Sequence, residues 1–278
     1  MLSGPLIPAT EALSLLDRAV FLDASAGPAA AERFRAAHLP GAIRADLEAD
    51  LSELGDRAKG GRHPLPPLDR WFARLGDWGV TRSSPVVIYD AAGGGMAAAR
   101  AWWMLRAIGH PAVLVAVVDG GWQALLEAKA PTESVESIAR PLGPYPSRTV
   151  RWPVVDADFV ERIRNDVSWR LIDARAPERY SGETEPIDPV AGHIPGAQNL
   201  YWRSQLEDGR LASLSSVRSR YQALVADVPP ERVVCYCGSG VTACHLLLTM
   251  EASGFQGAQL YLGSWSEWCR QDRPRAGD

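Results

Sequence analysis

Four sequence landmarks occur twice in the same order in this chain of 278 residues, and the repeat limits the folds that the chain can adopt. The four pairs of corresponding segments are 21–23 and 171–173, 37–42 and 192–197, Asp90 and Cys237, and 117–122 and 260–265. Corresponding positions are 143 to 155 residues apart. Because chance does not place four landmarks in one order at nearly one spacing, we interpret the chain as a tandem duplication.

Both halves alternate short apolar runs with helical segments. Residues 20–23, 86–90 and 112–118 are continuous apolar runs of the kind that parallel strands buried on both faces show. A helix is expected from about Met96 to Ile108. The pattern predicts an α/β fold in which each half forms a mostly parallel sheet flanked by helices.

A segment rich in proline and charge separates the halves. It carries Pro131, Pro141, Pro144 and Pro146, which favour an extended linker. We therefore expect an N-terminal domain at residues 1–126, a linker at 127–151 and a C-terminal domain at 152–278.

Charge and hydropathy limit the partners of such a chain. The formal net charge of −4 gives no basic footprint for nucleic acid. No apolar run approaches the roughly 18 residues that a membrane span needs, and no secretory signal is apparent at the N-terminus. Four cysteines in a chain of this size do not make a disulfide framework. We expect a cytoplasmic protein that binds neither nucleic acid nor membrane.

The sequence around Cys237 combines a buried strand, a loop of small residues and a helix. An apolar run ends at Cys237, Gly238 and Gly240 follow, and a helix is expected from Ala243. A cysteine that faces a helix N-terminus meets unpaired backbone N–H groups and the positive end of the helix dipole, which favour thiolate over thiol. The alternative is a buried, inert cysteine.

The string Cys237 to Thr242 resembles the active-site loop of the rhodanese superfamily, and is closest to its 3-mercaptopyruvate sulfurtransferase branch. The duplication and the linker extend the resemblance over nearly the whole chain. The resemblance implies a sulfurtransferase with tandem rhodanese-like domains, in which Cys237 carries the transferred sulfur as a persulfide. Neither a metal nor an organic cofactor is needed. The implied persulfide cradle consists of Gly238, Ser239, Gly240, Val241 and Thr242.

The first copy has Asp90 where the second has Cys237. A carboxylate cannot accept a sulfane sulfur, since the attacking and carrying group must be a thiolate. We therefore expect the first domain to be catalytically silent.

The residues after Cys237 bear on the choice of sulfur donor. Gly238 and Ser239 are uncharged, which favours 3-mercaptopyruvate over the thiosulfate dianion. By the resemblance, Arg179 binds the substrate carboxylate, whereas Arg175 is expected in a structural ion pair. The family usually has a second arginine after a Glu-Pro pair, where this chain has Ile187. Thiosulfate therefore stays open as the main donor.

A proton relay is also implied by the resemblance. By position it would consist of Ser239, His63 and Glu48, with Asp46 as the rival carboxylate. The alternative for His63 is simple packing in a proline-rich turn. His38 and His193 occupy the same turn in the two halves, so we interpret both as structural, and residues 263–268 as a support for the loop.

Other chemistries fit the loop less well. Cysteine phosphatases need an arginine six residues after the cysteine, and this chain has Ala243 there. The spacing of Cys235, Cys237, Cys244 and Cys269 is not that of zinc ligands, so no metal is expected. Cys235 or Cys244 could serve as a resolving thiol.

The expected sulfur acceptor is a thioredoxin-like protein, a low-molecular-weight thiol or cyanide. A non-catalytic sulfur carrier or regulatory module on the same fold is the alternative from another functional class. Turnover with small donors separates the two, because a carrier forms the persulfide without turning over.

Overall fold

The computed structural model describes residues 1–135 and 141–277. The predicted linker, 127–151, lies partly outside these described residues. The chain divides into two compact units. The first unit comprises Met1–Ser52, Pro66–Trp152 and Asp208–Arg210, and the second comprises Glu53–Leu65, Pro153–Glu207 and Leu211–Asp278. Residues 53–65 thus belong structurally to the second unit, although they precede most of the first in sequence. The domain boundaries expected from sequence stay a prediction.

The first unit contains a five-stranded sheet in the order β1-β5-β4-β2-β3, and every pair of neighbouring strands is parallel. Its elements are β1 (Leu6–Ile7), α1 (Ala9–Leu13), β2 (Val20–Asp23), α2 (Ala30–Ala36), β3 (Ile43–Arg44), α3 (Leu68–Asp77), β4 (Val86–Tyr89), α4 (Ala97–Ala107), η1 (Ala112–Leu114), β5 (Val115–Val118) and α5 (Gly121–Glu127).

The second unit contains a five-stranded parallel sheet in the order β6-β12-β11-β7-β8. Its elements, with the β9–β10 hairpin, are β6 (Val154–Val155), α6 (Ala157–Ile163), β7 (Arg170–Asp173), α7 (Pro177–Ser181), β8 (Gln198–Asn199), η2 (Trp202–Gln205), β9 (Leu206–Glu207), β10 (Arg210–Leu211), α8 (Leu214–Val225), η3 (Pro230–Arg232), β11 (Val233–Tyr236), α9 (Ala243–Ala252), β12 (Gln259–Tyr261) and α10 (Ser264–Trp268).

The two sheets have the same strand order, element for element, so the predicted α/β duplication is confirmed. The middle strands β4 and β11 are buried along their whole length, as continuous apolar runs require. Asp90 follows β4 and Cys237 follows β11, which places both at the carboxyl end of a central strand.

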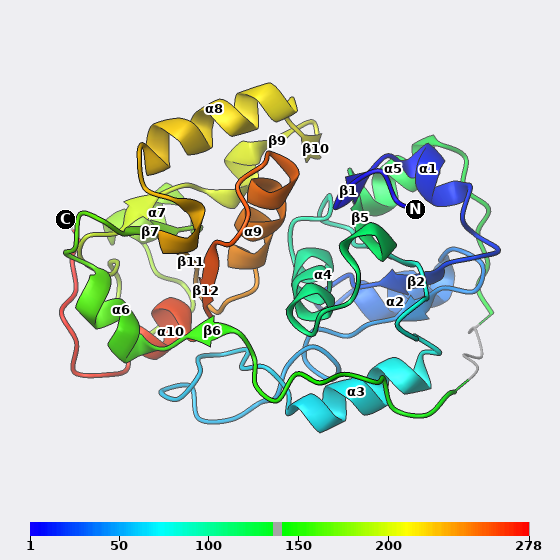
Figure 1. The fold of residues 1–278 in the computed structure, drawn as a ribbon, viewed down its shortest axis with the longest axis horizontal. Helices are drawn as coiled ribbons and strands as arrows, with labels where there is room; N and C mark the ends of the chain where they lie inside the picture. Colours follow the sequence, from blue (N-terminus) through cyan, green and yellow to red (C-terminus); the bar gives the residue numbers. More distant parts are fainter. Residues whose placement is uncertain (136–140, 278) are drawn as a thin grey trace. The chain divides into compact units, whose positions relative to one another are not determined.

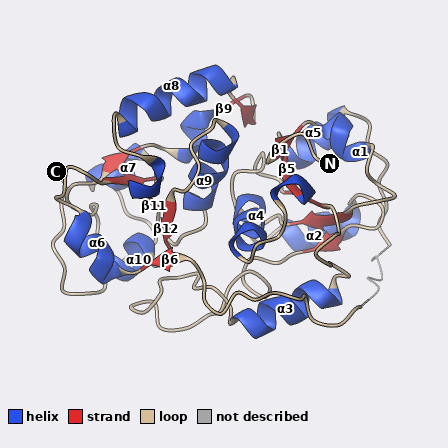
Figure 2. Cartoon of the chain, viewed as in Figure 1, coloured by secondary structure: helices blue, strands red, loops and turns tan. Residues whose placement is uncertain are grey.

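Helices cover both faces of each sheet (Figures 1 and 2). In the first unit, one face of β4 and β5 packs with α1, α2 and α5, and α4 contacts the same strands. In the second unit, α6 and α10 pack on one face of β11 and β12, and α9 contacts these strands as well. The two turn histidines have matching structural roles: Nδ1 of His38 lies 2.6 Å from the Phe34 carbonyl oxygen, and Nδ1 of His193 lies 2.7 Å from that of Tyr180.

Part of the predicted linker packs on the first unit. The amide of Tyr145 donates to the Phe72 carbonyl at 2.9 Å, and its buried hydroxyl lies 3.0 Å from Nδ1 of His110.

Among the described residues, no helix has both the length and the apolar character needed to cross a membrane.

Candidate active site

Cys237 is the first residue after the buried strand β11, and only 2% of its surface is exposed. The amide of Gly240 donates a hydrogen bond to its sulfur, with N and Sγ 3.2 Å apart. The loop continues to Thr242, which directly precedes α9. The thiol therefore accepts a backbone N–H in the loop that leads into a helix, a setting of the kind that stabilises a negatively charged sulfur.

Gly240 gives this loop its curvature. Its φ of +76° is a left-handed conformation that glycine adopts without strain. A Cβ atom at this position would lie 2.5 Å from the Leu262 carbonyl oxygen. A side chain is therefore excluded here. The individual roles of Gly238, Ser239, Val241 and Thr242 in holding a persulfide stay a prediction.

The turn at α10 supports the loop, as the sequence predicted. The Cys237 amide donates to Oγ of Ser264 at 3.1 Å, and the Cys237 carbonyl accepts from the Trp265 amide at 3.0 Å. The Gly238 carbonyl accepts from the Ser266 amide, also at 3.0 Å. Ser264 has a φ of +55°, a strained conformation for serine that these contacts hold in place.

The segment 53–65 contacts the same turn and belongs to the second unit (Figure 1). The amide of Gly60 donates to Oε1 of Glu267 at 2.7 Å, and the amide of Arg62 donates to Oγ of Ser266 at 3.0 Å. Nε2 of Gln271 donates to the Ala58 carbonyl at 2.9 Å. These bonds fix a segment without regular secondary structure beside the cysteine loop.

His63, on this segment, contacts the loop directly. Its Nδ1 lies 2.7 Å from Oγ of Ser239, which is a hydrogen-bond distance. The predicted pairing of these two side chains is therefore present, although its role as a proton relay stays a prediction.

The two candidate carboxylates of the relay, Glu48 and Asp46, belong to the first unit. Asp46 pairs with Arg44 and accepts from the amides of Glu48 and Ala49 at 2.8 and 3.0 Å. Burial raises the pKa of Asp46, but these hydrogen bonds outweigh it and the pKa is lowered overall. Glu48 is exposed, and its role in a relay stays a prediction.

Arg179, which is predicted to bind the substrate carboxylate, forms hydrogen bonds with Glu185. Its Nε and Nη2 donate to the Glu185 carboxylate at 2.7 to 3.1 Å. Its Nη1 has no hydrogen-bond partner within the described residues. A Cβ atom placed on Gly238 would lie 3.5 Å from both Nη1 and Nη2. The guanidinium of Arg179 therefore lies beside the residue that follows Cys237.

Arg62 is the residue that sequence reasoning missed. Its Nη1 pairs with Asp188, and its Nη2 lies 2.8 Å from the position of a Cβ atom on Gly238. Burial raises the pKa of Asp188, but Arg62 and Arg270 outweigh it, so the pKa is lowered. The available signal was that Arg62 directly precedes the candidate histidine His63.

Arg175 makes the structural ion pair that was expected. It is buried, and its Nη2 donates to Asp173 Oδ2 and to the Gly192 carbonyl, both at 2.7 Å. Its guanidinium also lies 4.9 Å from the ring centre of Trp265.

The other three cysteines are buried and form no disulfide. Burial raises the pKa of the Cys235 thiol well above its ordinary value, and burial also raises the pKa of Cys269. The Cys244 thiol donates to the Gly240 carbonyl, with Sγ and O 3.3 Å apart. A redox role for Cys235 or Cys244 stays a prediction.

Asp90 occupies the corresponding loop of the first unit, and burial raises the pKa of its carboxyl group although backbone hydrogen bonds oppose that shift. Its Oδ1 accepts from the amides of Ala92 and Gly94, both at 2.8 Å. Its Oδ2 accepts from the amides of Met96 and Ala98, at 3.2 and 3.1 Å. Four N–H groups of this loop and the start of α4 thus converge on one buried carboxyl group.

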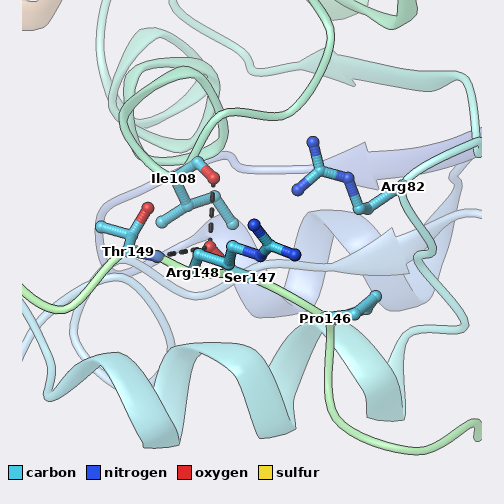
Figure 3. A pocket seen from close by; sticks show the side chains of 6 residues that line it. All are labelled: Arg82, Ile108, Pro146, Ser147, Arg148 and Thr149. Carbon is cyan, nitrogen blue, oxygen red and sulfur yellow. Dashed lines mark hydrogen bonds between the residues drawn. The ribbon is translucent and has the colours of Figure 1, made fainter.

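A separate cavity of about 770 Å³ lies in the first unit (Figure 3). It is lined by Arg82, Ile108, Pro146, Ser147, Arg148 and Thr149. The Ser147 hydroxyl donates to the Ile108 carbonyl and accepts from the Thr149 amide, each at 3.2 Å. None of the predicted site residues lines this cavity.

Across residues 1–135 and 141–277, no three His, Cys, Asp or Glu side chains are grouped as a metal site requires.

Two α/β units with parallel sheets, one with a cysteine in a glycine-containing loop between the central strand and a helix, define a duplicated protein with a candidate nucleophilic thiol. The sequence profile of the rhodanese-like domain matches residues 8–128 and 156–271, and the chain belongs to this family.

The relatives of the chain are sulfurtransferases by name. It is 43% identical over 237 residues to a probable 3-mercaptopyruvate sulfurtransferase of Pseudomonas aeruginosa, covering 85% of this chain and 82% of that protein. It is 34% identical to the human 3-mercaptopyruvate sulfurtransferase, with 96% and 88% covered. The structure of the 3-mercaptopyruvate sulfurtransferase from Leishmania major matches with a TM-score of 0.84 and 30% identity, covering 96% of this chain and 75% of that one.

Proposed function

We propose that this protein is a sulfurtransferase that moves a sulfane sulfur from 3-mercaptopyruvate to a thiol or cyanide through a persulfide on Cys237. The observation that carries the proposal is the Cys237 sulfur at the end of β11, which accepts a hydrogen bond from the Gly240 amide. The names of the relatives support the reaction class and the donor.

In the first half-reaction, the Cys237 thiolate attacks the sulfur of the donor. A bond forms between the two sulfurs and the carbon–sulfur bond of 3-mercaptopyruvate breaks. The electron pair leaves with the carbon, which takes a proton and becomes the methyl group of pyruvate. His63 and Ser239, 2.7 Å apart, are the groups that we assign to this proton transfer.

In the second half-reaction, an acceptor thiolate or cyanide attacks the outer sulfur. The sulfur–sulfur bond breaks, and its electron pair returns to Cys237 as thiolate. Because the enzyme alternates between two covalent states, donor and acceptor react in ping-pong order. We assign the acceptor role to a thioredoxin-like protein, a low-molecular-weight thiol or cyanide. We assign the reaction to the cytoplasm.

The Asp90 loop supports the role of the cradle. A carboxylate oxygen of aspartate and the outer sulfur of a cysteine persulfide are the same number of covalent bonds from Cα, so they occupy the same place in the side chain. In the first unit, each of the two oxygens at this place accepts from two backbone N–H groups. A duplicated loop built in the same way would stabilise a persulfide anion by the same kind of preorganised electrostatics.

Thiosulfate is the second candidate donor, and one observation favours it. The guanidinium groups of Arg62 and Arg179 both lie beside Gly238. The fold therefore brings positive charge to a loop whose own side chains carry none. A thiosulfate dianion would find cations here, and its reaction would release sulfite.

Steady-state kinetics with both donors tests the proposal. We expect a higher kcat/KM with 3-mercaptopyruvate than with thiosulfate. Charge-assisted hydrogen bonds contribute about 1.5–3 kcal/mol, so Arg179→Ala should lower kcat/KM for 3-mercaptopyruvate by roughly ten- to a hundred-fold. A higher wild-type kcat/KM with thiosulfate, or an Arg179→Ala variant that keeps its activity with 3-mercaptopyruvate, would overturn the donor assignment. Absence of turnover with either donor would favour a sulfur carrier.

A further inference from the structure

Two arginine nitrogens without hydrogen-bond partners lie close to the same point beside Cys237. The three atoms nearest to a Cβ position on Gly238 are Nη2 of Arg62, at 2.8 Å, and Nη1 and Nη2 of Arg179, both at 3.5 Å. Within the described residues, Nη2 of Arg62 and Nη1 of Arg179 have no hydrogen-bond partner. Their N–H groups are thus available to a ligand beside the residue that follows Cys237.

Three other nitrogens of these two side chains are held by acids. Asp188 binds Nη1 of Arg62, and Glu185 binds Nε and Nη2 of Arg179. Only 11% of the Arg62 side chain and 17% of the Arg179 side chain are exposed. Both guanidinium groups are therefore preorganised, and solvent screens them less than it screens surface arginines.

Gly238 leaves the space into which these nitrogens reach. A methyl group there would approach Nη2 of Arg62 to 2.8 Å, closer than the two groups tolerate without movement. The absence of a side chain at position 238 thus keeps the point of convergence free of side-chain atoms of this residue.

The charges around this point are not balanced. A continuous network of ion pairs joins the four guanidinium groups of Arg62, Arg175, Arg179 and Arg270 to the three carboxylates of Asp173, Glu185 and Asp188. The network carries one more positive than negative charge. An anion placed between Arg62 and Arg179 would balance it.

We propose that Arg62 is a donor-binding residue, whose free Nη2 acts with Nη1 of Arg179 to bind the carboxylate of a 2-oxo acid sulfur donor. This inference rests on the proposed function and adds a residue to it. Arg62 supplies the second guanidinium. At the position where the family usually has that arginine, this chain has Ile187, an exposed apolar side chain. Two arginines hold one carboxylate in a defined orientation better than a single arginine does.

Alkylation of Cys237 tests the anion site without any sulfur donor. Iodoacetate and iodoacetamide form the same kind of thioether bond and release iodide, but only iodoacetate carries a carboxylate. The ratio of their rates at Cys237 in the full-length protein therefore reports the anion preference of the site. We expect Arg62→Gln to lower the ratio of iodoacetate to iodoacetamide rates by about ten-fold, as expected for the loss of one charge-assisted hydrogen bond.

Arg270→Gln is the matched control. Nη1 of Arg270 also binds Asp188, at 2.8 Å, and donates to the Ser266 carbonyl at 2.6 Å. Arg270→Gln removes a partner of Asp188, but it leaves both nitrogens at Gly238 in place. We expect the alkylation ratio and the KM for 3-mercaptopyruvate to change less in this variant than in Arg62→Gln, because Arg270→Gln removes one positive charge of the network but neither nitrogen at Gly238. In Arg62→Gln, by contrast, the KM should rise more than kcat falls.

The outcomes separate the inference from the proposed function. A ratio that falls equally in Arg62→Gln and Arg270→Gln, or in neither, would overturn the inference. A ratio that falls only in Arg62→Gln, in a protein that does not turn over 3-mercaptopyruvate, would support the anion site and contradict the proposed function. If Arg62→Gln does not fold, Arg62→Lys keeps the charge but lacks the second branch of the guanidinium, and it should lower the same ratio.

Discussion

Nδ1 of His63 and Oγ of Ser239 lie 2.7 Å apart, although 176 residues separate them in the chain. The contact exists because the segment 53–65 hydrogen-bonds to the turn at α10, which in turn holds the backbone of Cys237. A histidine and a hydroxyl at this distance can pass a proton to a group beside the cysteine.

His63→Gln and Ser239→Ala should each lower kcat with 3-mercaptopyruvate by about a hundred-fold, within the usual range for general acid–base catalysis. The departing carbon needs a proton, whereas sulfite leaves thiosulfate as a stable anion. Activity with thiosulfate should therefore fall much less. The double variant should be no worse than either single one, because the two residues act as a unit. Equal losses with both donors would contradict the relay.

Gly238→Ala should weaken the binding of anionic donors, because its methyl group would displace Nη2 of Arg62. We expect kcat/KM for 3-mercaptopyruvate to fall by about ten-fold, as for one lost charge-assisted hydrogen bond. Gly55→Ala is a suitable control, since it lies on the same segment as Arg62 and no atom is within 4 Å of its Cβ position. An unchanged kcat/KM in Gly238→Ala would mean that Nη2 of Arg62 plays no part in donor binding.

Asp90→Ala should destabilise the first unit and spare the chemistry at Cys237. It removes the acceptor of four N–H groups, two of them buried and two partly buried, and each unsatisfied buried group costs about 1–3 kcal/mol. Asp90→Asn, which keeps one acceptor oxygen, should lose less. Thermal unfolding and kcat of the folded fraction measure the two effects. A fall in kcat comparable to that of a Cys237 variant would show that the first unit is not silent.

His245 should make stability depend on pH. Burial lowers its pKa from 6.5 to about 4, so between these values the unfolded chain binds more protons than the folded one. The free energy of unfolding is therefore highest above pH 6.5, where His245 is neutral in both states. It falls as the pH drops toward 4, because the unfolded chain then takes up the proton. At 1.36 kcal/mol per pKa unit, the loss is about 3 kcal/mol.

Urea unfolding at pH 7 and pH 4.5, for the wild type and for His245→Leu, isolates this effect, because all other groups titrate in both proteins. The wild type should lose more stability than the variant on acidification. Equal losses in the two proteins would show that His245 does not contribute.

Much of the fold could be predicted because the repeat and the apolar runs report the strands directly. The runs before Asp90 and Cys237 are the central strands of two sheets with one strand order. A structural ion pair at Arg175 was also predictable, because a buried arginine needs a carboxylate, although its partners Asp173 and Glu185 were not.

The position of Arg62 could not be predicted in the same way. It lies on a segment without regular secondary structure, so no periodicity indicates where its side chain points. Its place beside Gly238 depends on long-range bonds to Glu267, Ser266 and Asp188. Judged from its own side chains, the cysteine loop is uncharged, and only the fold brings two guanidinium groups to it.

The mass of the protein after incubation with 3-mercaptopyruvate, without an acceptor, tests the persulfide on Cys237 most directly. The wild type should gain the mass of one sulfur atom, and so should Cys235→Ser, Cys244→Ser and Cys269→Ser. Cys237→Ser should gain none and should have no turnover. A sulfur gain that persists in Cys237→Ser, or a wild type that turns over the donor without any gain, would contradict the account.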